Sequence, residues 1–188
     1  MRPERITEWY HAVLESQMVK GGIYIDATMG NGHDTLFLCE MAGENGKVLA
    51  FDIQEMAIEN TRKRLKEHGM EERAQLILDS HTNMTQYQEQ ETVDVICFNF
   101  GYLPGGDHSL ATKADTSVKA IEVALFLLKK GGILCMCIYS GKDTGYEEKD
   151  AILKYLKELD DKKYIVIVNR YYNRKNDPPM PVIVYKRG

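Results

Sequence analysis

The chain has 188 residues, of which 44% are hydrophobic and 28% are charged, and its formal net charge is −4. This length can bury the core of one domain, no apolar run approaches the roughly 18 residues of a membrane span, and the polar, mixed-charge start of the sequence is unlike a secretion signal. We therefore expect residues 1–188 to form a single domain that works in the cytoplasm.

Helical and strand patterns then alternate along the sequence. Residues 4–19 carry apolar side chains at helical spacing, which predicts an amphipathic helix, and we expect residues 1–20 to pack against the domain. A helix at residues 117–130 should end at the glycine pair Gly131–Gly132. The other predicted elements are strands at 21–28, 47–53, 74–79, 93–100 and 133–139, and helices at 33–43, 54–69 and 146–159.

The sequence closes with two apolar stretches, residues 163–172 and 181–187, and no helical pattern lies between them. Two strands joined in this way are most simply antiparallel, whereas alternating strands and helices build a parallel sheet covered on both faces. The sequence therefore predicts an α/β fold: a seven-stranded, mostly parallel sheet with a C-terminal antiparallel strand pair and helices on both faces. This is the pattern of a class I methyltransferase with a Rossmann-like fold, since a standard dinucleotide domain has six parallel strands.

The four cysteines argue against a metal site. Cys39, Cys97, Cys135 and Cys137 lie in apolar surroundings, with no CxxC pair and no zinc-type Cys/His spacing. We expect buried, reduced thiols and no metal.

Charge is unevenly distributed, because residues 162–188 contain seven basic residues and one acidic residue. This basic edge, which includes Arg174 and Lys175, could contact the phosphates of a nucleic acid. It could equally be a solvated edge strand whose lysines oppose aggregation.

The stretch YIDATMGNGHDT predicts a ligand loop between the first strand and the next helix. Asp26 ends the strand, and Gly30 and Gly32 let the backbone turn tightly and approach a ligand closely. A loop that binds pyrophosphate would carry a third glycine and leave the helix N-terminus open to the ligand. In this chain, Asp34 and Thr35 occupy those positions. We expect a cationic or zwitterionic ligand, although Asp34 and Thr35 could simply cap the helix.

Polar residues also close the next three strands. Asp52 could accept hydrogen bonds from ribose hydroxyls, and Asp79 could meet an adenine amino group or cap the segment that follows it. Asn99 closes the strand expected beside the first one. Because ligands of open α/β sheets bind at the carboxyl ends of the strands, these residues together predict one site.

Two motifs carry a resemblance to a known family. The pattern D-x-T-x-G-x-G at residues 26–32 resembles the first motif of S-adenosylmethionine-dependent methyltransferases, usually [DE]-x-G-x-G-x-G, with Thr28 in place of the first glycine. Together with NFGYLPGGDHS, it resembles the YtqB/MnmM-type family of bacterial proteins labelled rRNA methylases over essentially the whole chain. The resemblance implies S-adenosylmethionine as cofactor and N-methylation of 5-aminomethyl-(2-thio)uridine at the wobble position, with the anticodon loop of tRNA as substrate.

The resemblance also implies site residues. The methionine part of the cofactor would lie against Asp26, Thr28, Gly30, Asn31 and Gly32. His33 and Asp34 are further candidate cofactor contacts, although His33 could simply belong to the first turn of the helix. The ribose and adenine would lie against Asp52, Gln54, Asp79, Ser80 and His81. The transferring methyl group would lie near Asn99, Gly101 and Tyr102. The RNA would contact Tyr102, Pro104, His108, Arg174 and Lys175.

An alkylamine is mostly protonated at neutral pH and must lose its proton before it attacks. Asn99 could orient the amine through its side-chain oxygen. Where the family often has Tyr-His-Gly-His at the end of the fifth strand, this chain reads Tyr-Ser-Gly-Lys at residues 139–142, so it must use another group. The candidate proton acceptors are Tyr102, Asp107, His108 and Tyr139.

Other expectations complete the interpretation. Residues 100–112 contain three glycines and one proline and are placed to form a substrate wall or lid. His11, His68 and His108 are expected at the surface or in loops. A homodimer is plausible, since pairing would give this minimal domain more RNA surface. The alternative functions are methylation of rRNA or of a small molecule, a nicotinamide-dependent oxidoreductase, and a binding module that lost its chemistry.

Overall fold

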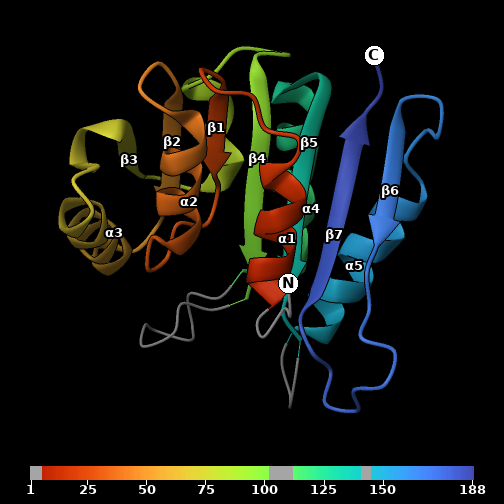
Figure 1. Ribbon diagram of the computed structural model, residues 1–188. Coiled ribbons are helices and arrows are strands. Elements are labelled where there is room, and N and C mark those ends of the chain that lie inside the picture. The colour runs from red at the N-terminus through yellow and green to blue at the C-terminus, as the bar shows by residue number, and fades with distance from the viewer. Residues whose placement is uncertain (1–5, 102–111, 141–144) are drawn as a thin grey trace.

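The strands of the protein form one sheet in the order β3-β2-β1-β4-β5-β7-β6 (Figure 1). The computed structural model describes residues 6–101, 112–140 and 145–188. The strands are β1 (Ile23–Asp26), β2 (Lys47–Asp52), β3 (Ala74–Leu78), β4 (Val93–Phe100), β5 (Leu128–Ile138), β6 (Tyr164–Val168) and β7 (Met180–Lys186). The first five pair in parallel, whereas β7 is antiparallel to both β5 and β6. The predicted α/β fold, with its C-terminal antiparallel pair, is confirmed.

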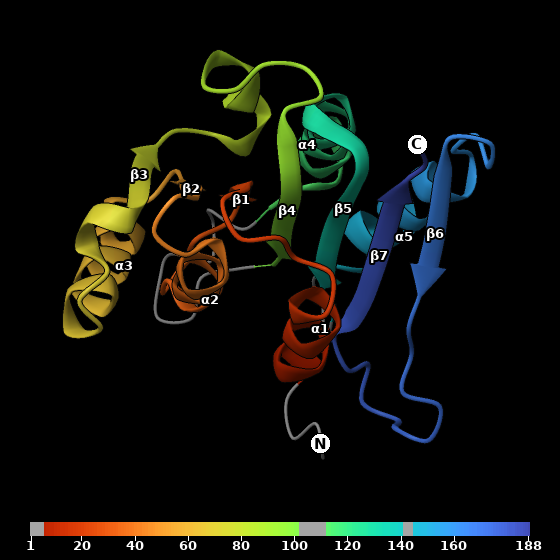
Figure 2. The same ribbon diagram turned by 45° about the horizontal axis from the view of Figure 1, so that its top comes forward.

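Helices cover both faces of this sheet, because successive side chains of a strand point to opposite sides (Figure 2). The helices are α1 (Ile6–Glu15), α2 (His33–Ala42), α3 (Glu55–Glu67), α4 (Ala114–Leu127) and α5 (Tyr146–Lys157), with the short 3₁₀ helices η1 (Glu71–Arg73) and η2 (His81–Gln86). Tyr24 of β1 belongs to the core beneath α1, α2 and α3, whereas its neighbour Ile25 belongs to the core beneath η2, α4 and α5.

One predicted boundary is wrong. The helix expected at residues 117–130 is α4, which ends at Leu127, and Gly131 and Gly132 lie inside β5 rather than closing the helix. Leu128 is already extended and pairs with Val93 of β4, and the register of the two strands shifts before they pair again. Strand pairing, and not helix propensity, therefore decides where this helix stops.

The sheet has its switch point between β1 and β4, the neighbouring strands at which the chain order reverses. Asp26 and Asn99 lie at the carboxyl ends of these two strands. The four cysteines are free and buried, as predicted. Within the described ranges, no helix combines the length and the apolar composition that crossing a bilayer requires.

Candidate active site

The turn after β1 is held in shape by two glycines with left-handed backbone angles. Gly30 has φ 50° and Gly32 has φ 74°. Helix α3 lies close behind the turn, so a Cβ atom added to Gly32 would lie 2.9 Å from the Cα atom of Thr61. The Thr61 hydroxyl also donates to the carbonyl oxygen of Gly30 at 3.2 Å. Both backbone geometry and space therefore require glycine at position 32.

Helix α3 fixes the rest of this turn through side chains that the sequence did not single out. Asn60 Nδ2 donates to Asn31 Oδ1 at 2.9 Å, and Arg64 Nε donates to the Asn31 carbonyl oxygen at 2.6 Å. Arg64 Nη2 also lies 3.1 Å from His33 Nε2. Asn60 and Arg64 are four residues apart and so share one face of the helix, which is the only sign of their role in the sequence.

Thr28 has a specific contact in the place where related motifs carry glycine. Its hydroxyl oxygen accepts a hydrogen bond from the backbone N–H of Asn99 at 2.6 Å, which ties the turn to the end of β4. The buried carboxylate of Asp26 accepts from the Thr28 N–H at 3.2 Å and from the Thr35 hydroxyl at 2.6 Å. Thr35 therefore does not cap α2, whose N-cap residue, Gly32, makes no side-chain cap.

Asp34 is the centre of a second buried network. Its carboxylate accepts hydrogen bonds from Asn99 Nδ2 at 2.8 Å and from the Tyr10 hydroxyl, and it pairs with His11 Nε2 at 2.8 Å. The His11 ring stacks on Phe37, with ring centroids 3.9 Å apart. The expectation that His11 is a surface residue is wrong, because α1 packs over the end of β4 and brings this ring to Asp34. Both carboxylate oxygens of Asp34 are bonded to these partners, so they do not cap the helix.

The two buried carboxylates have opposite protonation preferences. Burial and the neighbouring charge of Asp34 raise the pKa of Asp26. Burial alone would raise the pKa of Asp34 too, but hydrogen bonds from His11, Tyr10 and Asn99 hold it below its ordinary value. The negative charge of this interior therefore resides on Asp34.

Asp52, at the end of β2, supports the turn that follows β1. Its carboxylate accepts from the Gly30 N–H at 3.1 Å and from the Gln54 N–H at 3.0 Å. A carboxylate has about four acceptor positions, and the backbone N–H of Ile53 also interacts with this one, so at least one position stays open to a ligand. Burial raises the pKa of Asp52, while the hydrogen bonds from Gln54 and Gly30 oppose this effect.

Asp79, after β3, is more fully occupied. It accepts from the Ser80 N–H at 2.7 Å, from Asn83 Nδ2 at 2.8 Å and from the Tyr87 hydroxyl at 3.0 Å, which leaves about one acceptor position. Ser80, and not Asp79, is the N-cap residue of η2. The ring of His81 lies edge-on to Phe98 of β4, and burial lowers the pKa of His81.

The ends of β4 and β5 meet beside this site. The Tyr139 N–H donates to the Phe100 carbonyl oxygen at 2.9 Å. Burial is the main cause that raises the pKa of the Tyr139 hydroxyl, and the interaction with Cys137 raises it further. This group therefore stays protonated and serves better as a hydrogen-bond donor than as a proton acceptor. Four predicted site residues lie outside the described ranges: Tyr102, Pro104, Asp107 and His108.

Gly101 and Thr112, the two residues that flank this segment, are hydrogen-bonded to each other. The Gly101 N–H donates to Thr112 Oγ1 at 2.8 Å, and the Thr112 N–H donates to the Gly101 carbonyl oxygen at 3.0 Å. The buried carboxylate of Glu148 in α5 accepts from Ser117 of α4 and also bonds the Thr112 side chain. We call this closed pair of residues the neck.

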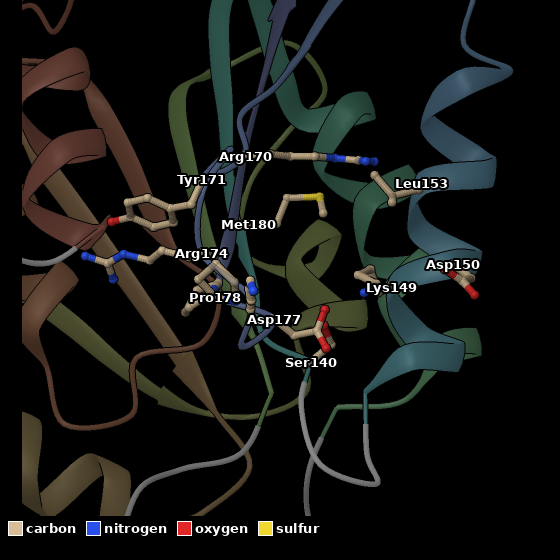
Figure 3. A pocket seen from close by; sticks show the side chains of 12 residues that line it. Ser140, Lys149, Asp150, Leu153, Arg170, Tyr171, Arg174, Asp177, Pro178 and Met180 are labelled. Atoms are coloured by element: carbon tan, nitrogen blue, oxygen red, sulfur yellow. The ribbon is translucent and has the colours of Figure 1, made fainter.

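A basic hollow of about 380 Å³ lies next to Ser140, between α5 and the connection from β6 to β7 (Figure 3). The Arg174 guanidinium lies 4.3 Å from the centroid of the Tyr171 ring. The charged side chains that line the hollow are four cations and two acids: Lys149, Arg170, Arg174, Lys175, Asp150 and Asp177. The structure thus brings Arg174 and Lys175 to the same edge of the sheet as the end of β5.

Known proteins resemble this chain closely. A family model described as "Putative rRNA methylase" matches residues 48–185. The chain is 36% identical to the "tRNA (mnm(5)s(2)U34)-methyltransferase, chloroplastic" of Arabidopsis thaliana, over 97% of this chain and 69% of that relative.

Solved structures agree with these matches. A crystal structure of a "putative rRNA-methylase" from Clostridium thermocellum has a TM-score of 0.94 and 42% identity, covering 99% of this chain and 100% of that one. A Streptococcus mutans methyltransferase in complex with S-adenosylhomocysteine (SAH) has a TM-score of 0.87 and 38% identity, covering 97% of this chain and 98% of that one. Both the family model and the sequence relative cover most of the described fold, and the chain therefore belongs to the rRNA methylase family of methyltransferases.

Proposed function

We propose that the protein transfers the methyl group of S-adenosylmethionine to the amine of 5-aminomethyl-(2-thio)uridine at the wobble position of tRNA. The observation that carries this proposal is the 36% identity, over 97% of the chain, to a relative named for methylation at position 34 of tRNA. The polar residues at the switch point of the sheet support a nucleoside-containing cofactor there, and the Streptococcus mutans neighbour was solved with SAH.

The cofactor would lie across the carboxyl ends of β1, β2 and β4. Asp52 keeps at least one acceptor position for the ribose hydroxyls, and Asp79 keeps about one for an adenine N–H. The turn at residues 28–32 would cradle the methionine part, with Asp26 holding the turn from within because its carboxylate is fully buried. Gln54, Ser80, His81 and Gly101 would complete the contacts.

The sulfonium activates the methyl group, so the protein must mainly align the amine with it. Holding two reactants in line can supply up to roughly 7–11 kcal/mol in the best intramolecular cases. Asn99 would receive the amine on its side-chain oxygen, because its nitrogen is already bonded to Asp34. The proton acceptor would come from residues 102–111, with Tyr102, Asp107 and His108 as candidates, since the Tyr139 hydroxyl is held protonated.

The basic hollow supports contact with the RNA backbone. Lys149, Arg170, Arg174 and Lys175 outnumber the two acids in its lining, and nearby Tyr172 is fully exposed and could stack on a base. Replacing Arg174 and Lys175 with alanine should weaken tRNA binding and lower its salt slope by roughly 0.7 for each lost single-strand phosphate contact. Unchanged affinity and slope would remove the hollow from the RNA surface.

We further propose a homodimer that works in the cytoplasm. The edge strand β6 exposes Ile165, Ile167 and Val168, and it leads directly into the segment that lines the basic hollow, so a second copy there would extend the RNA surface. The four buried free thiols fit a reducing compartment. Light scattering of wild type and Ile167→Lys tests the pairing, and a monomeric wild type would exclude it.

The proposal is tested by mass analysis of tRNA nucleosides after incubation with isotope-labelled S-adenosylmethionine. The expected product is a methylated aminomethyluridine, formed from tRNA that carries the aminomethyl group and absent with Asn99→Ala. Label in rRNA instead would favour the activity in the family's description, and no transfer to either RNA would refute the proposal. Thermal stabilisation by NAD but not by SAH would indicate an oxidoreductase.

A further inference from the structure

Helix α1 contributes two side chains to the centre of the site. Tyr10 is buried, with 1% of its surface exposed, and its hydroxyl donates to Asp34 Oδ2. His11 Nε2 lies 2.8 Å from Asp34 Oδ1. The same Oδ2 atom accepts from Asn99 Nδ2 at 2.8 Å. One buried carboxylate thus joins the first helix of the chain to the end of β4.

This carboxylate decides which atom of the Asn99 amide faces the ligand edge. An ionised carboxylate is only an acceptor, so the amide must turn its NH₂ group toward Asp34 and its oxygen away from it. The backbone N–H of Asn99 is bonded to Thr28, which fixes the residue from its other side. Asn99 therefore has one orientation for as long as Asp34 stays charged and in place.

The surroundings keep that charge on Asp34. The ionisable groups near it on β4, on β5 and directly after β5 are the thiols of Cys97, Cys135 and Cys137 and the hydroxyl of Tyr139. Burial raises the pKa of each of them, so they are neutral. Asp26, on β1, has a raised pKa because of burial and of Asp34 itself. Among the residues that the structure describes, Tyr10 and His11 bring donors to Asp34 from outside the sheet and the first motif.

We propose that Tyr10 and His11 are positioning residues for methyl transfer: through Asp34 they hold the Asn99 amide with its oxygen directed at the incoming amine. This role rests on the proposed function, because it requires an amine nucleophile beside Asn99. It gives two residues of α1 a positioning role, although α1 lies outside the residues that the family model matches.

Four variants separate positioning from simple packing. His11→Leu and Tyr10→Phe each remove a donor to Asp34, whereas His11→Gln keeps an amide N–H at the same reach. Leu14→Ala truncates a fully buried side chain of the same helix and keeps both donors to Asp34, so it reports the effect of lost packing alone. For each variant, kcat and KM for tRNA methylation and the SAH dissociation constant would be measured below the unfolding transition.

We expect His11→Leu and Tyr10→Phe to lower kcat by about tenfold or more, since small misplacements of reacting groups cost up to about 100-fold. The SAH dissociation constant should change by less than about twofold, a difference of under about 0.4 kcal/mol. His11→Gln should recover most of kcat, and Leu14→Ala should lower the melting temperature while retaining kcat. Equal loss of kcat in Leu14→Ala, or no loss in His11→Leu and Tyr10→Phe, would overturn the proposal.

A second measurement does not depend on the substrate. In ¹⁵N-asparagine-labelled protein, the side-chain NH₂ signal of Asn99, identified by its absence in Asn99→Asp, should exchange slowly with solvent in the wild type. It should shift and exchange faster in His11→Leu and Tyr10→Phe, and return toward the wild-type position in His11→Gln. An unmoved signal in all variants would overturn the positioning role even if methylation is observed. A moved signal with no methylation by the wild type would instead refute only the proposed function.

Discussion

Replacing Gly32 with alanine tests how tightly the first turn is packed against α3. Gly32 has φ 74°, and an added Cβ atom would lie 2.9 Å from both Cα and Oγ1 of Thr61. The Cα atom belongs to the helix backbone and cannot swing aside as a flexible side chain could. A left-handed backbone costs a non-glycine residue roughly 1–2 kcal/mol, and overpacking a filled site costs roughly 1–3 kcal/mol more. We expect a total loss of about 2–5 kcal/mol in the free energy of unfolding.

Gly69 provides a matched control. It follows the end of α3 with φ 67°, but an added Cβ atom there would meet nothing within 4 Å. Gly69→Ala should therefore cost only the backbone contribution of roughly 1–2 kcal/mol. The difference between the two variants isolates the steric contribution of Thr61.

Urea unfolding of wild type, Gly32→Ala and Gly69→Ala measures these free energies, and calorimetry with SAH measures the effect on the turn. Gly32→Ala should weaken SAH binding at least about tenfold, or about 1.4 kcal/mol, because the turn must move away from α3. Gly69→Ala should bind SAH as the wild type does. If Gly32→Ala is no more destabilising than Gly69→Ala, the close approach of α3 does not constrain this position and the reasoning fails.

Three further predictions address other parts of the site. Thr28→Val should destabilise the protein by about 1–3 kcal/mol, because it leaves the part-buried Asn99 N–H without its acceptor. Thr28→Ser should stay near wild type in the same urea titration, and equal loss in both would contradict this account. Asp26 has a raised pKa in the folded state, so its protonation stabilises the protein at low pH, and this contribution is lost as the pH rises toward the folded pKa of about 7. Between pH 5 and 8, the free energy of unfolding should therefore fall more steeply for the wild type than for Asp26→Asn. Parallel curves for the two proteins would contradict this prediction. Asp52→Ala should abolish detectable SAH binding by calorimetry, since it removes the proposed ribose acceptor and the support of Gly30 and Gln54; normal affinity would count against the assignment.

Periodicity and turn residues were enough to predict the strands, the helices and the polar strand ends, because these depend on local patterns. The sequence also placed Asn99 beside the first strand correctly, since the doubly wound pattern brings β1 and β4 together. Networks across elements were not predictable in the same way. His11 is one polar residue on an amphipathic helix, and nothing local distinguishes it from a solvated one, whereas its contact with Asp34 arises only when α1 packs over β4.

The same limit applies to Thr28 and α3. The sequence marked Thr28 as a departure from the usual glycine, but only the folded chain reveals its bond to the Asn99 N–H. Asn60, Thr61 and Arg64 look like ordinary positions of a surface helix, yet they hold the first turn. Tertiary distance, and not residue type, assigns these roles.

The neck formed by Gly101 and Thr112 has a practical consequence for engineering. Because Gly101 and Thr112 are joined by two hydrogen bonds and backed by Glu148, the two residues that flank positions 102–111 are held together by contacts outside those positions. The neck therefore marks the two positions at which the sequence of a relative could be joined to this chain, so that acceptor preference could be compared between relatives while β4 and the turn at residues 28–32 stay unchanged.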